Sequence, residues 1–202
     1  MNDVAPKTPL RPVLPITLEG RFVRLEPIAG HHRAGLAALY ADAGAKILRN
    51  SPFPGSFDDY IDAALAALTP DRHLPFVVRE QGTDAFIGMT RLFDILPCDR
   101  GLEIGYTWYH PTFWGGPTNP ECKLLLMTHA FEGCGYERVQ LKTDARNLHS
   151  QAAMTKMGAT CEGTLRHHKV RPDGLWRDSV FFSVLAQEWP AVKAGLQARL
   201  AG

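Results

Sequence analysis

One stretch in the middle of the chain constrains the fold most, because it places a single helix between two alternating strand patterns. Residues 102–110 (LEIGYTWYH) and 137–144 (ERVQLKTD) both alternate apolar and polar side chains, as strands do. Residues 120–135 (PECKLLLMTHAFEGCG) are apolar nearly all round and close with glycines, which is typical of a helix covered on more than one side. A strand, a helix and a strand in this order predict a parallel pair joined by a right-handed crossover.

The alternation in the first of these strands predicts which way its side chains point. One face would carry Leu102, Ile104, Tyr106 and Trp108, and the other Glu103, Gly105, Thr107 and Tyr109. We therefore expect an apolar face against the core and a mixed face that presents Glu103.

The remaining patterns predict a complete α/β domain around this unit. In chain order they indicate a strand at 22–28, helices at 31–43 and 55–70, a strand hairpin at 75–93, a helix at 147–158, two long strands within 160–185 and a helix at 188–200. Ser56 is a favoured helix cap, and Pro172-Asp173-Gly174 is a turn between the two long strands. The predicted order is β α α β β β α β α β β α.

Length and charge limit the function classes. A chain of 202 residues with 45% hydrophobic content is expected to form one domain, residues 16–202, after a proline-rich arm at 1–15. The net charge of +1, from 22 basic and 21 acidic residues, gives no footprint for nucleic acid. No apolar run is long enough to span a membrane, and the four cysteines lack metal-ligand or disulfide-framework spacing. We expect a cytoplasmic protein with reduced thiols, no metal and no membrane partner.

The segment PTFWGGPTNPECK, residues 111–123, has a pattern that favours binding of an anion at the start of the central helix. Asn119 is a preferred cap and Pro120 a preferred first residue, so unpaired amides would face the preceding loop. Gly115 and Gly116 permit close backbone approach, and Thr118 adds a hydroxyl. A simple glycine turn before a helix is the alternative, and the phosphate loops with Gly-Lys-Ser/Thr or GxGxxG are excluded by composition.

The element order and three segments resemble one acyltransferase family. The segments are LEIGYTWYHPTFWGGPTNPE, RVQLKTDARNLHSQAAMTKMGATCEGTLRHH and RDSVFFSVLAQEWP. Over about residues 16–195 the chain resembles the GCN5-related N-acetyltransferases (GNAT), most closely the branch of the ribosomal-protein alanine N-acetyltransferases. The resemblance implies a mixed, mostly antiparallel sheet flanked by helices, in which parallel strands four and five splay apart around the pantetheine arm of acetyl-CoA.

The same resemblance implies where the coenzyme would bind. The backbone around Trp108, Tyr109 and His110 would supply an amide for the thioester oxygen. The pyrophosphate would lie on the loop that matches the family pattern Gln/Arg-x-x-Gly-x-Gly/Ala, here Trp114, Gly115, Gly116, Pro117, Thr118 and Asn119. Pro117 occupies the position of the key glycine and has no amide to donate, so the neighbouring amides and the Thr118 hydroxyl must compensate.

The family mechanism is direct attack of an amine on the thioester, without an enzyme nucleophile. Glu103 matches a glutamate that removes the amine proton in histone acetyltransferases, although it is equally explained as a sheet glutamate balanced by Arg91 or a neighbour. Asn147 would bind the pantetheine amides or cap its helix, and Ser150 would protonate the departing thiolate, because Met154 replaces the usual tyrosine. Lys169 stands where the ribosomal-protein branch has a glutamate.

The acceptor is expected to be a primary amine, on a small molecule or at a protein N-terminus. Trp114, Trp176, His167 and Arg177 are candidates to border its pocket, and core packing or hairpin pairing explains them as well. His167 and His168 alternate, so at most one faces the site. Two alternatives stay open, namely a coenzyme-A-binding sensor or partner-binding module with little turnover, and a transferase of longer acyl groups such as succinyl. The final strands would also suit a homodimer contact.

Overall fold

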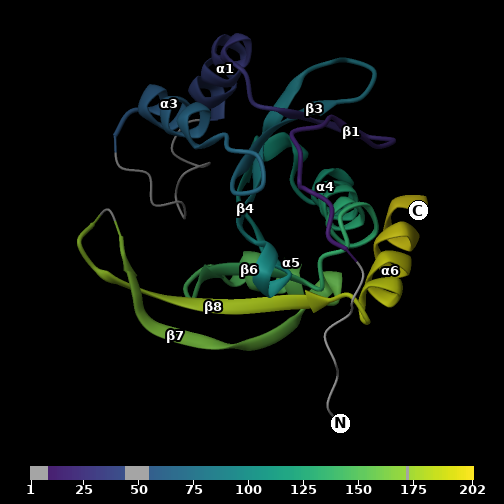
Figure 1. The fold of residues 1–202 in the computed structure, drawn as a ribbon. Helices are drawn as coiled ribbons and strands as arrows, with labels where there is room; N and C mark the ends of the chain where they lie inside the picture. Colours follow the sequence, from purple (N-terminus) through teal and green to yellow (C-terminus); the bar gives the residue numbers. More distant parts are fainter. Residues whose placement is uncertain (1–8, 44–54, 172) are drawn as a thin grey trace.

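The structure is a computed structural model that describes residues 9–43, 55–171 and 173–202, and one mixed sheet runs through it (Figure 1). Within these residues the sheet has eight strands in the order β1-β2-β3-β4-β5-β6-β8-β7. The strands are β1 Leu18–Glu19, β2 Val23–Pro27, β3 Leu74–Glu80, β4 Phe86–Leu96, β5 Gly101–Tyr109, β6 Arg138–Asp144, β7 Thr160–Val170 and β8 Trp176–Leu185. The helices are α1 Arg33–Ala43, α3 Phe57–Ala67, α4 Thr118–Thr128, α5 Leu148–Met157 and α6 Trp189–Ala201.

The predicted order of elements is confirmed, with the short β1 added before it. Only β5 and β6 pair in parallel, and the other neighbouring strands of the described chain are antiparallel. Ser56 caps α3 as expected, its Oγ accepting the amide of Asp59. Pro172 of the predicted turn lies outside the described residues, and Gly174 beyond it has φ +78°.

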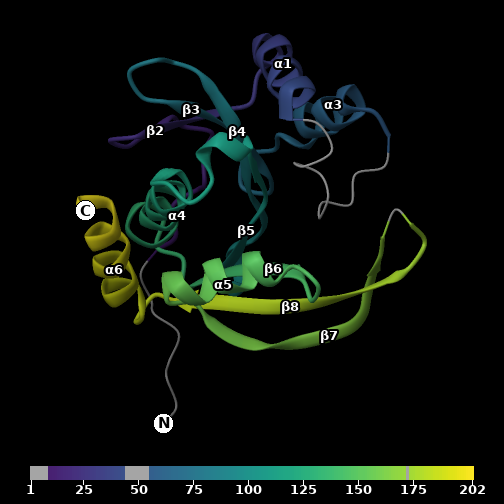
Figure 2. The same ribbon diagram turned by 180° about the vertical axis from the view of Figure 1, so that it is seen from behind.

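The core forms two clusters on opposite faces of the sheet. Alternate residues of β3 divide between them, because Phe76 and Val78 join the larger cluster and Val77 joins the smaller one. The larger cluster lies under α4 and α6, and the smaller one lies under α1 and α3. Figure 2, seen from behind, shows α5 beside β6 and β8, with α1 and α3 at the other end of the molecule.

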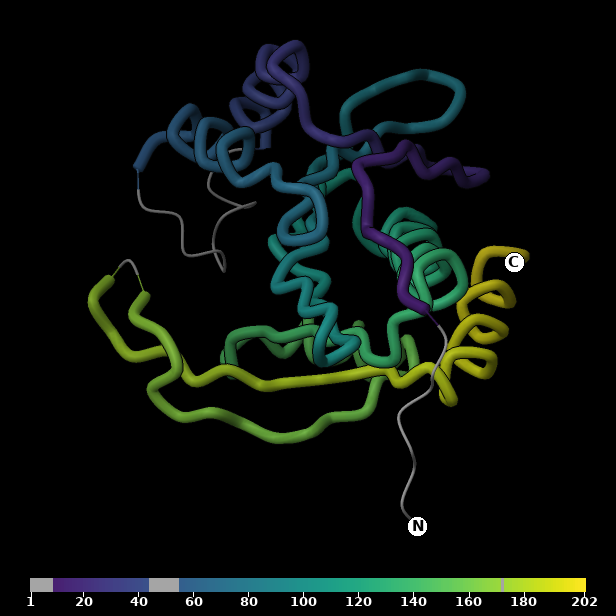
Figure 3. The backbone as a smooth tube through the Cα atoms, in the orientation of Figure 1, coloured from purple at the N-terminus to yellow at the C-terminus, as the bar shows by residue number. Residues whose placement is uncertain are grey.

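The described part of the proline-rich arm packs against the domain. Val13 is fully buried, and its amide donates to Asp71 Oδ1 at 2.9 Å. The amide of Arg11 donates to the carbonyl of Cys134 at 3.0 Å. Figure 3 shows this purple stretch running beside α4. No helix in the described ranges is long and apolar enough to cross a membrane.

The parallel pair opens into a wedge soon after it starts, which confirms the predicted splay. Gly101–Glu103 of β5 pairs with Arg138–Gln140 of β6, and no pairing follows, although β5 continues to Tyr109 and β6 to Asp144. We use "the wedge" for the space between residues 104–109 of β5 and 141–144 of β6. Glu103 therefore lies at its apex, where the last residue pair forms.

A bulge in β5 corrects the alternation expected from the sequence. Tyr106 has φ +50°, and the register with β4 slips there, so that Met89 faces Trp108 whereas Arg91 faces Gly105. Tyr106 was expected beside Leu102 on the apolar face, and this prediction is wrong because the extra residue turns the side chain outward, leaving it 42% exposed. The bulge also exchanges the faces of the next residues, so the prediction is wrong for Trp108, which joins the smaller cluster, and for Tyr109, which joins the larger one.

Candidate active site

Glu103, at the apex of the wedge, is buried but keeps one oxygen free of partners. Gln140 Nε2 and Lys142 Nζ both donate to its Oε2, at 2.9 and 2.5 Å. Its Oε1 accepts no hydrogen bond from the part of the chain that the structure describes. Burial to 2% exposure raises the pKa of Glu103, and the hydrogen bond and charge of Lys142 oppose that rise. The ion partner is thus Lys142, not Arg91, and Oε1 is the atom that can meet an amine.

An aromatic patch lies beside this carboxylate. The ring of Phe93 packs edge-on against Tyr106 with centroids 5.0 Å apart, and Lys142 Nζ lies 5.2 Å from the Phe93 centroid. Gly105 makes this packing possible, since a Cβ there would lie 2.8 Å from a Phe93 ring carbon. The bulge and this glycine together bring an aromatic wall to the face that carries Glu103.

The backbone at the end of β5 presents one amide toward the wedge. His110 donates its amide to the carbonyl of Ile87 on the β4 side at 2.8 Å, so it cannot serve as an oxyanion donor. Because successive residues of a strand point their backbone groups in opposite directions, the amide of Tyr109 faces away from β4. Consistent with this, the Tyr109 carbonyl accepts the indole N–H of Trp114 at 2.9 Å. The indole N–H of Trp108 instead donates to the Tyr60 hydroxyl.

Helix α4 begins two residues earlier than the sequence predicts. Pro117 is its N-cap, with φ −73° and ψ −14°, so the prediction of Asn119 as cap is wrong. The fixed φ of proline already suits a helix, which lets the first turn start at Thr118. The Asn119 side chain instead accepts a long hydrogen bond from the Tyr109 hydroxyl, at 3.4 Å.

The tip of α4 has backbone donors to spare. Within the described residues, no acceptor is present for the amides of Gly115, Gly116, Thr118 and Asn119. Pro117 and Pro120 interrupt this series, because neither has an N–H. Gly115 has φ +77°, a conformation that glycine adopts without strain. Four unpaired amides at the positive end of a helix can bind an anion.

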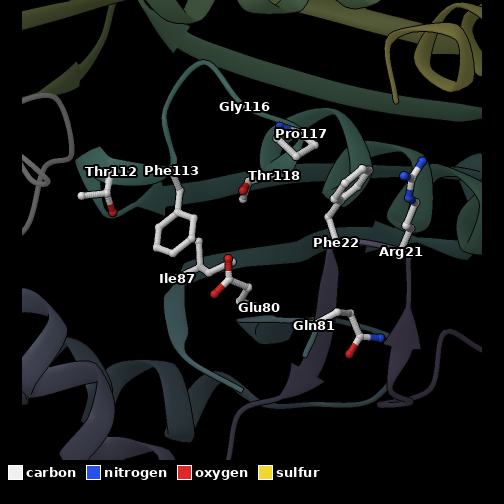
Figure 4. A pocket seen from close by; sticks show the side chains of 10 residues that line it. All are labelled: Arg21, Phe22, Glu80, Gln81, Ile87, Thr112, Phe113, Gly116, Pro117 and Thr118. Atoms are coloured by element: carbon white, nitrogen blue, oxygen red, sulfur yellow. The ribbon is translucent and has the colours of Figure 1, made fainter. Parts of the chain in front are cut away.

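A pocket of ≈ 210 Å³ opens beside this tip (Figure 4). Gly116, Pro117 and Thr118 form one side, and Arg21 and Gln81 of the β2–β3 region border it opposite. Among the residues that line it, none comes from β6 or α5. The pocket therefore adjoins the loop but is not the wedge.

Glu121, in the first turn of α4, points away from the loop and holds the start of β2. Its carboxylate accepts the amides of Arg21, Phe22 and Val23 at 2.8, 2.6 and 2.7 Å, and its side chain is buried. Three backbone donors of a strand end are thereby satisfied by one acid.

Helix α5 starts on the β6 side of the wedge. Asn147 caps it, its Oδ1 accepting the amide of Ser150 at 3.1 Å, which confirms the capping reading. The rings of Trp114 and His149 lie 6.4 Å apart, so the loop after β5 and the first turn of α5 approach each other. Met154 packs against the main core, and so it offers no polar group to the wedge.

Two further ionisable groups of α4, Cys122 and Lys123, are buried beside Glu121. Burial raises the pKa of the Cys122 thiol to about 12, which removes it as a nucleophile. Burial lowers the pKa of Lys123 from 10.5 to about 8, and its Nζ donates to Thr107 Oγ1 at 3.2 Å.

One cluster of metal-ligand types occurs in the described ranges, at Glu26, His31 and His32. His32 uses both ring nitrogens, since Nδ1 accepts the Ala29 amide at 3.0 Å and Nε2 lies 2.9 Å from Glu26 Oε2. These contacts occupy both ring nitrogens of His32 and one carboxylate oxygen of Glu26.

The structure also separates the candidates for the acceptor pocket. His167 and Trp176 stack on each other, with centroids 5.0 Å apart and rings nearly parallel, so these two pair within the hairpin. His168 instead packs edge-on against Phe181, whose ring lies 5.9 Å from Lys142 Nζ. Arg177 alternates with Trp176 along β8 and therefore points to the Glu103 side.

Sequence reasoning missed the partners of Glu103. Gln140 and Lys142 alternate along β6 with core residues, and Gln140 is opposite Glu103 in the parallel register. The period-two pattern of 137–144 places both on one face, which was the available signal.

Comparison with known proteins gives a consistent result. The family model of the acetyltransferase (GNAT) domain matches residues 23–160. A solved structure from T. thermophilus, described provisionally as an acetyltransferase, is 38% identical, covers 93% of this chain and 98% of its own, and superposes with a TM-score of 0.78. A GCN5-related N-acetyltransferase from Brucella melitensis is 29% identical, with coverage of 96% and 90% and a TM-score of 0.84.

A more distant neighbour is Mycobacterium smegmatis RimJ, solved in complex with CoA-disulfide. It is 22% identical, covers 94% of this chain and 97% of its own, and has a TM-score of 0.78, which shows likeness of fold alone. The search of curated protein sequences returned no match. The matched domain spans the wedge, the loop and α5, and the chain belongs to the GNAT acetyltransferase family.

Proposed function

We propose that this protein transfers an acetyl group from acetyl-CoA to the primary amine of a small molecule or a protein N-terminus. The observation that carries the proposal is the wedge, with Glu103 at its apex and unpaired amides at its mouth. From Glu103 to Tyr109 the bare edge of β5 is six residues, or roughly 20 Å at ~3.3 Å per residue. This length suits an extended pantetheine arm.

The loop and the start of α5 would hold the coenzyme. The four unpaired amides from Gly115 to Asn119, with the Thr118 hydroxyl, would bind the pyrophosphate at the helix tip. Asn147 uses its Oδ1 as a cap, which leaves its Nδ2 donors for a pantetheine carbonyl. These residues fit a long ligand that is anionic at one end and has amides along its length.

The coenzyme would supply a thioester. Side chains and one backbone amide of the protein would accept the amine proton and donate hydrogen bonds to the reacting atoms. Glu103 Oε1 would accept the proton of the amine, and the amide of Tyr109 would donate to the thioester oxygen. Ser150 would donate a hydrogen bond to the departing thiolate. An α-amino group, with a pKa of ~7.7 to 8.0, needs less help from a base than a lysine at ~10.4.

Thiol release from acetyl-CoA over a panel of amines and peptide N-termini tests the proposal. We expect turnover, thermal protection of the folded protein by acetyl-CoA, and slower turnover with succinyl-CoA. Protection without turnover on any amine would favour the coenzyme-binding sensor, an alternative that Pro117 and Met154 motivate. A cytoplasmic location stays part of the proposal and rests on the sequence alone.

A further inference from the structure

The face of the sheet that presents Glu103 gathers cations from four strands. They are Arg91 of β4, Lys142 of β6, Lys169 of β7 and Arg177 of β8. We call these four the cation cluster.

Contacts on this face join the members of the cluster. Lys142 is bonded to Glu103, and Lys169 lies directly opposite Arg177 in the β7–β8 register. The Arg91 guanidinium lies 4.4 Å from the centroid of Tyr106. Burial lowers the pKa of Arg177, and the charges of Asp144, Glu103 and Tyr106 oppose that lowering. Tyr106, turned outward by the bulge, therefore lies on the same face as the cation cluster and in contact with Arg91.

The two arginines are buried, and no anionic side chain in the described part of the chain forms a hydrogen bond or ion pair with them. Arg177 is 8% exposed and makes no hydrogen bond or ion pair within the described residues. Arg91 is 4% exposed, packs on the rings of Tyr60 and Tyr106, and has one polar neighbour, His73 Nε2 at 3.4 Å. The buried side-chain atoms left without a partner in the described chain are Arg91 Nε, Arg177 Nε, His168 Nδ1 and Ser179 Oγ.

The four partnerless atoms share one face of the sheet. Arg177 and Ser179 alternate along β8 with Val180 and Phe182 of the main core, and His168 packs on Phe181 of the same strand. Arg91 points to the side of α3, as its contact with Tyr60 shows. Because buried polar groups are normally hydrogen-bonded, this concentration marks a place that a ligand completes.

Within the described residues no carboxylate forms a hydrogen bond or ion pair with either arginine, although the charge of Asp144 acts on Arg177 from a distance and opposes the lowering of its pKa by burial. Glu103 is bonded to Lys142, and both oxygens of Asp144 accept from Arg171, at 2.7 and 2.8 Å. Asp94 is exposed and lies 3.8 Å from Lys142. Outside the described residues, the sequence of 44–54 contains Lys46 and Arg49 but no acid, and Asp3 is the one acid in 1–8. The pKa of Lys169 is lowered by burial and then by the charges of Lys142 and Arg177, while Glu103 and Asp94 oppose that lowering.

We propose that the amine acceptor also carries an anionic group, a carboxylate or a phosphate, which Arg177 and Arg91 bind while the amine meets Glu103. This inference rests on the proposed acetyl transfer and names the class of its acceptor. The planar guanidinium fork matches both oxyanions. The anion would satisfy the Nε donors of the two arginines, and the aromatic wall of Phe93 and Tyr106 would cover the carbon atoms between anion and amine.

Matched pairs of amines test the charge requirement. L-alanine is compared with L-alaninamide, and O-phosphoethanolamine with ethanolamine, by thiol release from acetyl-CoA. We expect the anionic member of at least one pair to have a kcat/KM at least tenfold higher, mainly through KM, and the better pair identifies carboxylate or phosphate. Equal or better turnover of the neutral member in both pairs would overturn the inference and leave acetyl transfer intact.

Variants of the arginines test their role. Arg177→Gln and Arg91→Gln are expected to reduce the anionic-to-neutral ratio of kcat/KM at least tenfold, with Arg177→Lys in between. Arg199→Gln, an equal charge change on the exposed side of α6, should leave that ratio within twofold of wild type. Without ligand, Arg177→Gln should have a Tm equal to or above wild type, because a partnerless buried charge is removed. A clear fall in Tm would assign Arg177 a structural role and contradict the inference.

A binding measurement separates failure of this inference from failure of acetyl transfer. If no amine releases thiol, the proposed function fails, and the anion site is judged by thermal shift with L-alanine and O-phosphoethanolamine. Protection of wild type that is lost in Arg177→Gln supports the site, and the absence of protection by either compound overturns it.

Discussion

Replacing the buried Lys123 by methionine should stabilise the protein at neutral pH. Its side chain is 7% exposed on α4, its pKa is lowered from 10.5 to about 8 by burial, and its one hydrogen bond goes to Thr107. At pH 7 the lysine is charged in the folded and the unfolded chain, so the folded state bears the cost of a buried charge. A pKa difference of about 2.5 corresponds to about 3 kcal/mol.

The methionine loses the hydrogen bond to Thr107, worth ~1 kcal/mol, while Thr107 keeps Thr90 as a partner at 2.8 Å. The net gain for Lys123→Met is therefore about 2 kcal/mol at pH 7, or roughly 4 to 8 °C in Tm for a chain of this size.

The gain in stability from Lys123→Met should become smaller as the pH rises. Between the folded pKa of about 8 and the unfolded value of 10.5, the unfolded chain holds more protons, so wild-type stability from this group rises with pH. At about pH 9.5 the remaining penalty falls to ~1 kcal/mol, which the lost hydrogen bond offsets, and the advantage of the variant should vanish.

Urea unfolding at both pH values measures the difference, with Lys156→Met on the exposed face of α5 as control. A variant less stable than wild type at pH 7 would refute the reasoning. So would a gain of equal size at both pH values, because it would come from packing alone.

Three further predictions concern the site and its support. Glu103→Gln should lower kcat/KM by ~10² to 10⁴. Because burial raises the pKa of Glu103, the kcat/KM of the wild type should fall as the pH drops through that raised pKa. If the variant shows the same fall of kcat/KM at acidic pH, Glu103 is excluded as the base. Glu121→Ala should cost about 3 kcal/mol or more in urea unfolding, since three amides lose a charged acceptor, and a loss below ~1 kcal/mol would contradict this. Pro117→Ala restores an amide in a helix-compatible conformation. At ~0.3 to 1 kcal/mol per helix-end contact, the affinity for coenzyme A measured by calorimetry should rise roughly two- to fivefold. Unchanged affinity would mean that this amide does not face the phosphates.

Periodicity and helix length predicted the features that depend on neighbouring residues. The parallel β5–β6 pair and the helix between them follow from a pattern within about forty residues. The caps at Ser56 and Asn147 each follow from the few residues around them. The bulge at Tyr106 was missed, although Gly105 just before it was an available signal, because a glycine inside a strand pattern often marks a bulge. The start of α4 was misplaced because proline is tolerated throughout the first turn of a helix, and Pro120 occupies its third position, not its first.

The charged surroundings of Glu103 could not be predicted from spacing. Arg91, Lys142, Lys169 and Arg177 span nearly half the sequence and meet only because the sheet order places β8 between β6 and β7. Alternation says which face each residue occupies, but the register of four strands decides which of them are neighbours.

The wedge also divides the sheet mechanically. Strands β1 to β5 and strands β6 to β8 are two half-sheets that share three residue pairs in the described chain, and beyond these pairs the edges of β5 and β6 are not paired with each other. A ligand with amides of its own would form hydrogen bonds with both strand edges and so connect the two half-sheets. In hydrogen exchange, the amides of the two half-sheets should then become exposed as separate units without ligand, and as one unit when a ligand is bound between β5 and β6.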